Sequence, residues 1–132
     1  MTIRCYCTAL RTLTRRVTTL YDAALAPLGI GVAQFSIMRS VLRAGPVTAT
    51  ALGHLVDLDR STVSRNIRVL ERLRLVRLER GATDQRQMTI TLTAKGRRVL
   101  DDGAPLWDRA QDDLRNQMGR AAGALLDIVN AA

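Results

Sequence analysis

The sequence predicts a mainly α-helical fold with one small β-hairpin. Several segments carry apolar residues at spacings of three and four, which gives a helix one apolar side, and breaks containing Gly or Pro separate these segments. Two short segments, 75–80 and 88–92, alternate apolar and polar residues instead, as strands do. With 132 residues, of which 47% are hydrophobic, the chain is long enough for one domain with a modest core.

The first segment, residues 3–26, predicts a long N-terminal helix. Pro27, Gly29 and Gly31 end it. A helix of this length at the start of a small chain has little within the chain to pack on, so we expect it to contact a second subunit. Its apolar stripe comprises Ile3, Cys7, Leu10, Val17, Leu20, Tyr21 and Ala24, with Leu13 on the flank.

The middle of the chain predicts three shorter helices, over residues 32–44, 49–56 and 59–73. Asp59 is a good N-cap for the third, because its carboxylate can accept hydrogen bonds from the first free backbone N–H groups. The last two of these helices, joined by a tight turn, form a helix-turn-helix pattern.

The alternating segments 75–80 and 88–92 then predict a two-stranded hairpin whose polar loop, residues 81–87, carries an arginine. A helix-turn-helix followed by such a hairpin is a winged helix, and this order of elements is much more specific than either part. After the hairpin, residues 93–118 predict a long helix that Gly103 and Pro105 are expected to bend, and residues 120–130 predict a last apolar helix.

Positive charge is concentrated in the winged-helix region. The formal net charge is +8, and residues 58–87 contain eight arginines against four acidic residues. Residues 96–132 contain five arginines against six aspartates, so the C-terminal part is close to neutral. This distribution favours a polyanionic partner that contacts the middle of the chain.

The segment 59–73 has the pattern of a DNA-recognition helix. Val63, Ile67, Leu70 and Leu73 form one apolar stripe that can anchor it to a core, and its other faces carry hydroxyl groups and then arginines. Hydroxyl and guanidinium groups can reach base edges and phosphates of double-stranded DNA in the major groove. An ordinary amphipathic surface helix is the alternative interpretation. The predicted DNA-contacting residues are Arg60, Ser61, Thr62, Ser64, Arg65 and Arg68, with Arg86 at the hairpin tip.

These segments divide one intertwined domain into three regions. Residues 1–31 form an N-terminal dimerisation helix, residues 32–95 a winged helix-turn-helix DNA-binding region, and residues 96–132 C-terminal dimerisation helices. The helices at both ends are expected to form the dimerisation layer that flanks the winged helix.

Other classes of protein are disfavoured. No apolar run approaches the roughly 20 residues of a membrane span, and arginines interrupt the N-terminal segment, so we expect a cytoplasmic protein without a signal peptide. One histidine and no Ser/His/Asp, paired-carboxylate or phosphate-loop arrangement argue against an enzyme. We expect no cofactor and no metal.

The residues resemble the MarR family of bacterial transcription regulators from about residue 5 to 130. The most specific part of the resemblance is Asp84-x-Arg86-x-x-x-x-x-Leu92-Thr93-x-x-Gly96, and residues 59–65 look like the start of the family's recognition helix. The resemblance implies a homodimer, more often a repressor than an activator, that binds a pseudo-palindromic operator. It also implies that Arg86 inserts at the wing tip and that Asp84 orients the wing. The alternative is that Asp84 and Arg86 are ordinary turn residues.

An arginine at a hairpin tip can enter a narrow minor groove, where the electrostatic potential is most negative. Asp84 would repel phosphate, so its expected role is internal, as a hydrogen-bond or ion-pair partner that holds the wing.

Cys5 and Cys7 are the chain's two cysteines. Two residues on a helix point about 200° apart, so the two thiols are not expected to bridge while that helix persists. Cys7 resembles the reactive cysteine of the family's organic-hydroperoxide sensors, and Tyr21 matches a tyrosine that bonds to it across the dimer, whereas Arg11 replaces the second such tyrosine. The alternatives are that Cys7 only packs at the subunit interface, or that the two thiols bind Cu(I) or another soft metal, for which His54, the one further soft ligand, lies in a distant segment.

The sequence therefore predicts a homodimeric transcriptional repressor that a small-molecule effector or thiol oxidation releases from DNA. The family often takes small aromatic effectors between the dimerisation layer and the winged helix, although Trp107 and Phe35 are expected to be core residues. A sequence-neutral architectural DNA-binding protein and, less favoured, a thiol-redox or metal-handling protein remain as alternatives.

Overall fold

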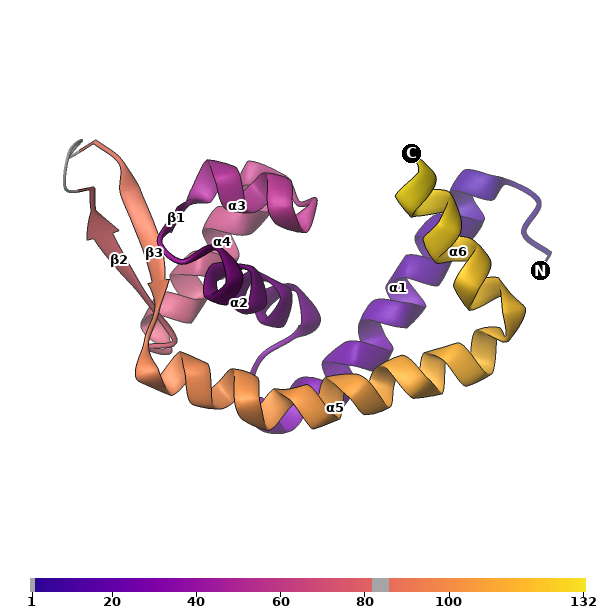
Figure 1. Cartoon of the computed structure of the whole chain (residues 1–132). Helices are drawn as coiled ribbons and strands as arrows, with labels where there is room; N and C mark the ends of the chain where they lie inside the picture. The colour runs from indigo at the N-terminus through magenta and orange to yellow at the C-terminus, as the bar shows by residue number, and fades with distance from the viewer. Residues whose placement is uncertain (1, 82–85) are drawn as a thin grey trace.

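The computed structural model describes residues 2–81 and 86–132, and it confirms the mainly α-helical winged-helix fold (Figure 1). In Figure 1, α5 runs along the base and joins a lobe, made of α2 to α4 and the sheet, to an arm formed by α1 and α6. The elements are α1 (Tyr6–Leu25), the 3-10 turn η1 (Ala26–Leu28), α2 (Val32–Ala44), β1 (Val47–Thr48), α3 (Ala49–Val56), α4 (Arg60–Arg72), β2 (Val76–Arg80), β3 (Met88–Leu92), α5 (Ala94–Met118) and α6 (Arg120–Ala131).

The sheet has three strands rather than the two that the sequence predicts. β3 pairs antiparallel with β2 from Val76↔Leu92 to Arg80↔Met88, and on its other side with β1, where Val47 lies opposite Ile90. β1 is only two residues long, so it offers no alternation for a sequence pattern to detect. Its pairing closes the sheet against the start of α3.

The first helix begins at Tyr6, three residues later than predicted. Cys5 is its N-cap, with an extended backbone (φ −88°, ψ 121°). The apolar stripe continues back to Ile3, but Ile3 is 41% exposed and buries too little surface in the chain to hold another turn. Cys7 therefore lies within the helix, whereas Cys5 precedes it. The expectation that both cysteines belong to one helix is wrong.

The last two helices lie within one residue of the predicted segments 93–118 and 120–130. α5 is a single helix from Ala94 to Met118 with Pro105 inside it, and Figure 1 shows a gentle curve and no break. Gly103 lies on the side of α5 that faces the lobe, where a Cβ would be 2.5 Å from Phe35 Cε2. The glycine therefore permits the close approach of α5 to α2.

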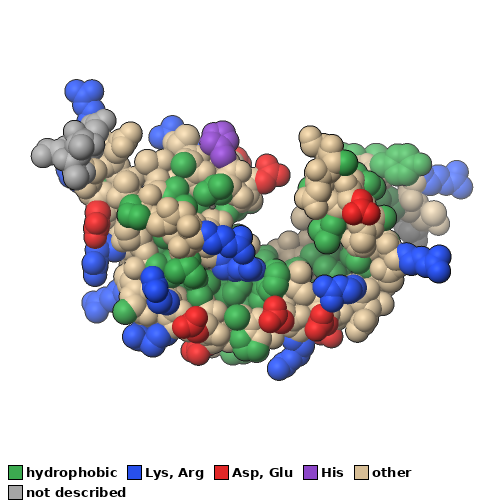
Figure 2. Space-filling view, viewed as in Figure 1, with side chains coloured by type: hydrophobic (Ala, Val, Ile, Leu, Met, Phe, Trp, Pro, Cys, Tyr) green, Lys and Arg blue, Asp and Glu red, His purple; other side chains and the backbone are tan. Residues whose placement is uncertain are grey.

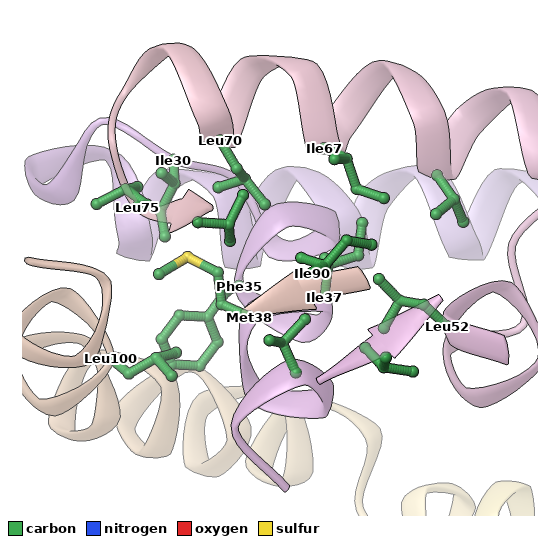
Figure 3. Packing of buried hydrophobic residues seen from close by; sticks show 14 of the residues in the cluster. Ile30, Phe35, Ile37, Met38, Leu52, Ile67, Leu70, Leu75, Ile90 and Leu100 are labelled. Atoms are coloured by element: carbon green, nitrogen blue, oxygen red, sulfur yellow. The ribbon is translucent and has the colours of Figure 1, made fainter. Parts of the chain in front are cut away.

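The hydrophobic core lies within the lobe. Side chains from α2, α4 and β3 converge there (Figure 3). The cluster that they form includes Phe35, Met38, Ile67, Leu70 and Ile90. Phe35 is 2% exposed, which confirms it as a core residue. The arm contributes little to this core, because α6 has no buried residue and α1 has only two.

Among the described helices, none taken alone has the length and apolar character of a membrane span. One pair, Tyr6–Leu28 with Val32–Ala44, satisfies the length and composition test together but is bent by 72°. The second member of this pair is α2, whose buried residues face the lobe core described above.

The start of α5 is fastened to the turn between α4 and β2. Thr93 caps α5 by accepting from Gly96 N at 3.0 Å, and its hydroxyl donates to the Arg74 carbonyl at 2.7 Å. Thr93 N also donates to the Leu75 carbonyl. A Cβ on Gly96 would lie 2.1 Å from that same carbonyl oxygen, so only glycine allows the helix to dock this closely.

We predict that Gly96→Ala destabilises the fold by about 1–3 kcal/mol, because the added methyl group must displace backbone rather than a flexible side chain. Urea unfolding measures the change. Gly123→Ala on α6 is the control, since a Cβ there meets nothing within 4 Å, and it should be neutral or slightly stabilising. Equal stability of both variants would contradict the docking role of Gly96.

Candidate nucleic-acid interface

The apolar stripe of α4 fixes how the helix is rotated on the lobe. Val63 and Leu70 are fully buried and Ile67 is 5% exposed. Leu73, which the sequence pattern adds to the stripe, is instead the C-cap and is 38% exposed, because the chain leaves the helix and turns through Arg74 at φ 61°. With three residues of the stripe in the core, the opposite face of α4 is directed to solvent.

That solvent-directed face carries the residues that the sequence predicts to contact DNA. Four of them are exposed and two are half-buried, and all six belong to the first nine residues of one helix. The exposed residues are Arg60, Ser61, Arg65 and Arg68, and the half-buried ones are Thr62 and Ser64. The structure therefore brings hydroxyl and guanidinium groups together on one rigid element.

The start of α4 is ordered by its predicted cap. The Asp59 carboxylate accepts from Thr62 N at 2.7 Å and from the Ser61 hydroxyl at 3.2 Å. Hydrogen bonds from Thr62, by side chain and backbone, and then from Ser61 hold the pKa of Asp59 below its ordinary value, and the nearby Arg65 guanidinium acts in the same direction. Arg65 also donates to the Thr62 hydroxyl at 3.2 Å, so these side chains are pre-ordered before any contact with DNA.

The wing extends from the same lobe. In Figure 1 the hairpin of β2 and β3 projects beyond the helices. Arg86 is exposed beside β3, whereas Asp84 lies outside the described residues. On β2, Arg77 and Glu79 approach to 3.8 Å across exposed surface, which contributes little to stability.

A small hollow of about 190 Å³ separates α4 from the hairpin. Ser64 and Arg68 line it from the helix, and Leu78 and Met88 line it from the strands. Ser64 and Arg68 therefore lie on the side of α4 that faces the wing.

Five exposed aspartates lie on α5, whereas Asp59, Glu71 and Glu79 lie on or beside α4 and the wing. Figure 2 shows a row of acidic side chains along the base of the molecule, where α5 runs. The exposed aspartates of α5 are Asp101, Asp102, Asp108, Asp112 and Asp113, and the same helix carries five exposed basic residues, Lys95, Arg97, Arg98, Arg109 and Arg115. α5 is therefore formally neutral, whereas residues 58–87 carry eight arginines against four acidic residues, so net positive charge favours a polyanion at α4 and the wing.

A second hollow, of about 220 Å³, lies between α2 and α5. Its distinctive feature is Arg39, whose guanidinium carbon is 4.3 Å from the centre of the Trp107 ring and 5.9 Å from that of Phe35. Trp107 is half-buried rather than a full core residue. Sequence reasoning missed Arg39; its position four residues after Phe35, on the same side of a helix, was the available signal.

Cys5 is an exposed thiol whose pKa is lowered by its neighbours at the start of α1. A hydrogen bond from the Thr8 side chain, and then the backbone N–H groups of Thr8 and Cys7 at the start of α1, lower the pKa of Cys5. Both cysteines are free and exposed. The sequence analysis favours Cys7 as the reactive residue and does not identify this property of Cys5.

Tyr21 is not near Cys7 within one chain. Fourteen residues of helix separate them by about 21 Å along α1. The Tyr21 hydroxyl donates to Gln111 Oε1 on α5, and the ring is 8% exposed. Burial raises the pKa of Tyr21, against a smaller opposing effect of the Arg115 guanidinium.

Metal-binding groups are not assembled in the described part of the chain. Within residues 2–81 and 86–132, no three His, Cys, Asp or Glu side chains are placed to hold one ion. His54 is exposed on α3, whereas the cysteines lie at the start of α1.

Comparison with known proteins identifies relatives of this architecture. The model of the MarR family matches residues 28–87. The M. tuberculosis transcriptional regulator MosR in complex with DNA is 34% identical, with a TM-score of 0.85, and the match covers 97% of this chain and 93% of that one. MosR in a second structure is 32% identical, with the same coverage and a TM-score of 0.84. No curated protein matches the sequence significantly.

More distant solved structures share the fold. BpsR of Bordetella bronchiseptica, described with 6-hydroxynicotinic acid as regulator of its DNA binding, is 18% identical with a TM-score of 0.87, over 97% of this chain and 92% of that one. A mutant MarR from E. coli complexed with operator DNA is 20% identical with a TM-score of 0.82, over 94% and 89% of the two chains.

MarR-family regulators are generally non-enzymatic DNA-binding proteins. The chain has a winged helix with an exposed cationic recognition helix, and it matches the proteins described above. It therefore belongs to the MarR family and is a sequence-specific DNA-binding transcriptional regulator.

Proposed function

We propose that the chain acts as a homodimeric repressor that occupies a pseudo-palindromic operator and leaves it when a signal reaches the dimer. The observation that carries the proposal is α4, whose buried stripe holds six hydroxyl- and guanidinium-bearing residues outward on one helix. Such a helix fits the major groove, with its first residues at base edges. Repression then follows from occupation of the promoter, and the role is regulatory rather than catalytic.

The wing is proposed to contact the same duplex beside α4. Arg86 is exposed next to β3, and an arginine there can enter a narrow minor groove, where negative potential is greatest. Asp84 is proposed to orient the wing, as the family resemblance implies.

Exposed apolar surface on the arm supports the dimer. Leu10 on α1 is 57% exposed, and Leu126 and Val129 on α6 are 61% and 63% exposed. Exposed apolar side chains on both helices of the arm are the kind of surface that a second subunit would cover. In a symmetric dimer the same surface of each chain meets its copy, which buries both at once and places two α4 helices on one side of the assembly.

The signal is proposed to act on the thiols at the start of α1. A thiolate of Cys5 or Cys7 attacks an organic hydroperoxide, breaks the O–O bond and yields a sulfenic acid and an alcohol; condensation of the sulfenic acid with a second thiol then forms a disulfide and releases water. The lowered pKa of Cys5 supports this residue as the attacking group. Tyr21 is proposed to approach Cys7 only across the dimer.

A small-molecule signal has its own support in the hollow between α2 and α5. Trp107 offers an aromatic face and Arg39 a cation there, and BpsR is described with 6-hydroxynicotinic acid as a regulator of its DNA binding. A planar ligand that displaces Arg39 from Trp107 would change how the lobe packs on α5.

We predict that Arg65→Ala combined with Arg68→Ala weakens operator binding at least about 100-fold, because each base contact of this type contributes about 1–3 kcal/mol. Fluorescence anisotropy at fixed salt measures the affinity. Arg97→Ala combined with Arg98→Ala on α5 removes the same charge from exposed positions elsewhere, and should weaken binding far less. Equal losses in both double variants would contradict a specific role for α4.

We predict that Leu126→Asp combined with Val129→Asp converts the dimer to a monomer, because two charges would be buried at the proposed interface. Sedimentation velocity measures the mass. Asp127→Asn, a change at an exposed residue of the same helix, is the control and should leave the dimer intact. A dimeric double variant would place the interface elsewhere.

We predict that the rate of alkylation of Cys5 by iodoacetamide, measured in Cys7→Ser, has its pH midpoint below that of a cysteine in an unstructured peptide, because the pKa of Cys5 is lowered. The lowered pKa leaves more thiolate at neutral pH. Thr8→Val removes the first hydrogen-bond donor and should raise the midpoint.

An organic hydroperoxide should release wild-type protein from its operator but should not release Cys5→Ser. Release of Cys5→Ser to the same extent would assign the signal to Cys7.

A further inference from the structure

The N-terminus of α2 is capped by a residue of another helix. The N-cap of α2 is Gly31, which has no side chain to accept a hydrogen bond. Asp22 on α1 supplies the acceptor instead, with Val32 N donating to its Oδ1 at 2.8 Å. Gln34 completes the cap by accepting from Gly31 N at 3.1 Å. A carboxylate at this position also interacts favourably with the positive end of the α2 dipole.

The need for glycine at position 31 comes from this contact and not from the backbone conformation of the residue. Its φ of −103° is open to any residue. A Cβ on Gly31 would nevertheless lie 2.8 Å from Asp22 Oδ1 and 3.4 Å from its Cγ. The glycine therefore allows the carboxylate to reach the first N–H groups of α2.

The contact lies where the arm meets the lobe. The preceding residue, Tyr21, donates its hydroxyl hydrogen bond to Gln111 on α5. Two adjacent residues of α1 therefore contact two different helices: Tyr21 contacts α5, and Asp22 contacts α2. The chain between α1 and α2 contains Gly29 in the left-handed region (φ 75°) and Gly31, so the covalent connection alone constrains the angle weakly.

We propose that Asp22 is a positioning residue for DNA binding, which fixes the angle of the lobe on the arm and thereby the half-site spacing that the protein accepts. The proposal rests on the homodimer of the proposed function. Two recognition helices must enter major grooves about 34 Å apart. α4 packs on α2 through the shared core (Figure 3), so a rotation of α2 on α1 moves both α4 helices relative to each other.

The angle itself is tested first by a measurement that requires neither DNA nor a dimer. Spin labels at Glu71→Cys on α4 and Asp113→Cys on α5, both exposed positions, report the distance between the lobe and the part of α5 that Tyr21 of α1 contacts, in a Cys5→Ser, Cys7→Ser background. Labelled chains are diluted with excess unlabelled chains, so that distances within one chain dominate. Asp22→Ala is expected to broaden and shift the distance distribution, whereas Asp102→Ala, the loss of an exposed carboxylate elsewhere, should leave it unchanged.

A second variant keeps the proposal falsifiable if Asp22→Ala does not fold. Gly31→Ala pushes the same carboxylate away without removing it, and should broaden the distribution in the same way. In an Asp22→Ala background, Gly31→Ala should add no further broadening, because the group it displaces is absent. A narrow, wild-type distribution in folded Asp22→Ala or in Gly31→Ala overturns the proposal.

DNA binding supplies the readout that a merely stabilising contact would not change. Operator duplexes are compared in which the half-sites lie one base pair closer or further apart. Wild-type protein should prefer one spacing by about tenfold, the effect of one poorly fitted base pair, and Asp22→Ala should lose most of this preference while binding the best duplex. An unchanged preference overturns the role of Asp22, whereas absence of operator binding by wild-type protein overturns the proposed function and leaves the distance measurement to decide on Asp22.

Discussion

The burial of one apolar stripe on α4 is the constraint on which the rest of the molecule depends. Val63, Ile67 and Leu70 occupy the centre of the lobe core, and each contributes roughly 1.5–3 kcal/mol by leaving water. Rotation of α4 about its axis would expose all three at once. The helix therefore has one orientation, in which Arg65 and Arg68 remain outside, and a rigid cationic face follows from hydrophobic packing rather than from any property of the arginines.

Much of this could be predicted from the sequence because the determinants are local. The stripe of α4, the Asp59 cap and the Thr93 cap are all patterns within a few residues, and the structure has each of them. The predictions that failed depended on where a local pattern stops. The stripe of the first helix continues to Ile3 although the helix begins at Tyr6, because periodicity does not reveal whether a residue has a surface to pack on.

The parts that could not be predicted are contacts between distant segments. β1 exists only because Val47 lies opposite Ile90, and two residues carry no strand pattern of their own. Asp22 caps a helix that starts ten residues later, and Arg39 stacks on a tryptophan in another helix. Position in the sequence marks neither Val47 nor Asp22, and it marks Arg39 only by its spacing of four residues from Phe35, since each residue acquires its role from a partner that the fold supplies. Asp84 and its predicted role lie outside the described residues.

α1 connects the features that regulation would need. Its first residues carry the thiols, of which Cys5 has a lowered pKa, and its last turns hold α5 through Tyr21 and α2 through Asp22. We propose that a change at the start of this helix, or at the apolar surface beside it, reaches the joint between arm and lobe through the helix itself. The net positive charge of residues 58–87 in turn favours DNA on the side of α4 and the wing.

The central claim is that the outward face of α4 reads the major groove in two half-sites of one operator. Guanine N7 methylation interference on a duplex selected by the protein tests it most directly, because N7 lies in the major groove. If α4 reads the major groove in both half-sites, two clusters of interfering guanines are expected about one helical turn apart, on the same side of the duplex. Interference spread evenly along the duplex, or binding indifferent to N7 methylation, would contradict it.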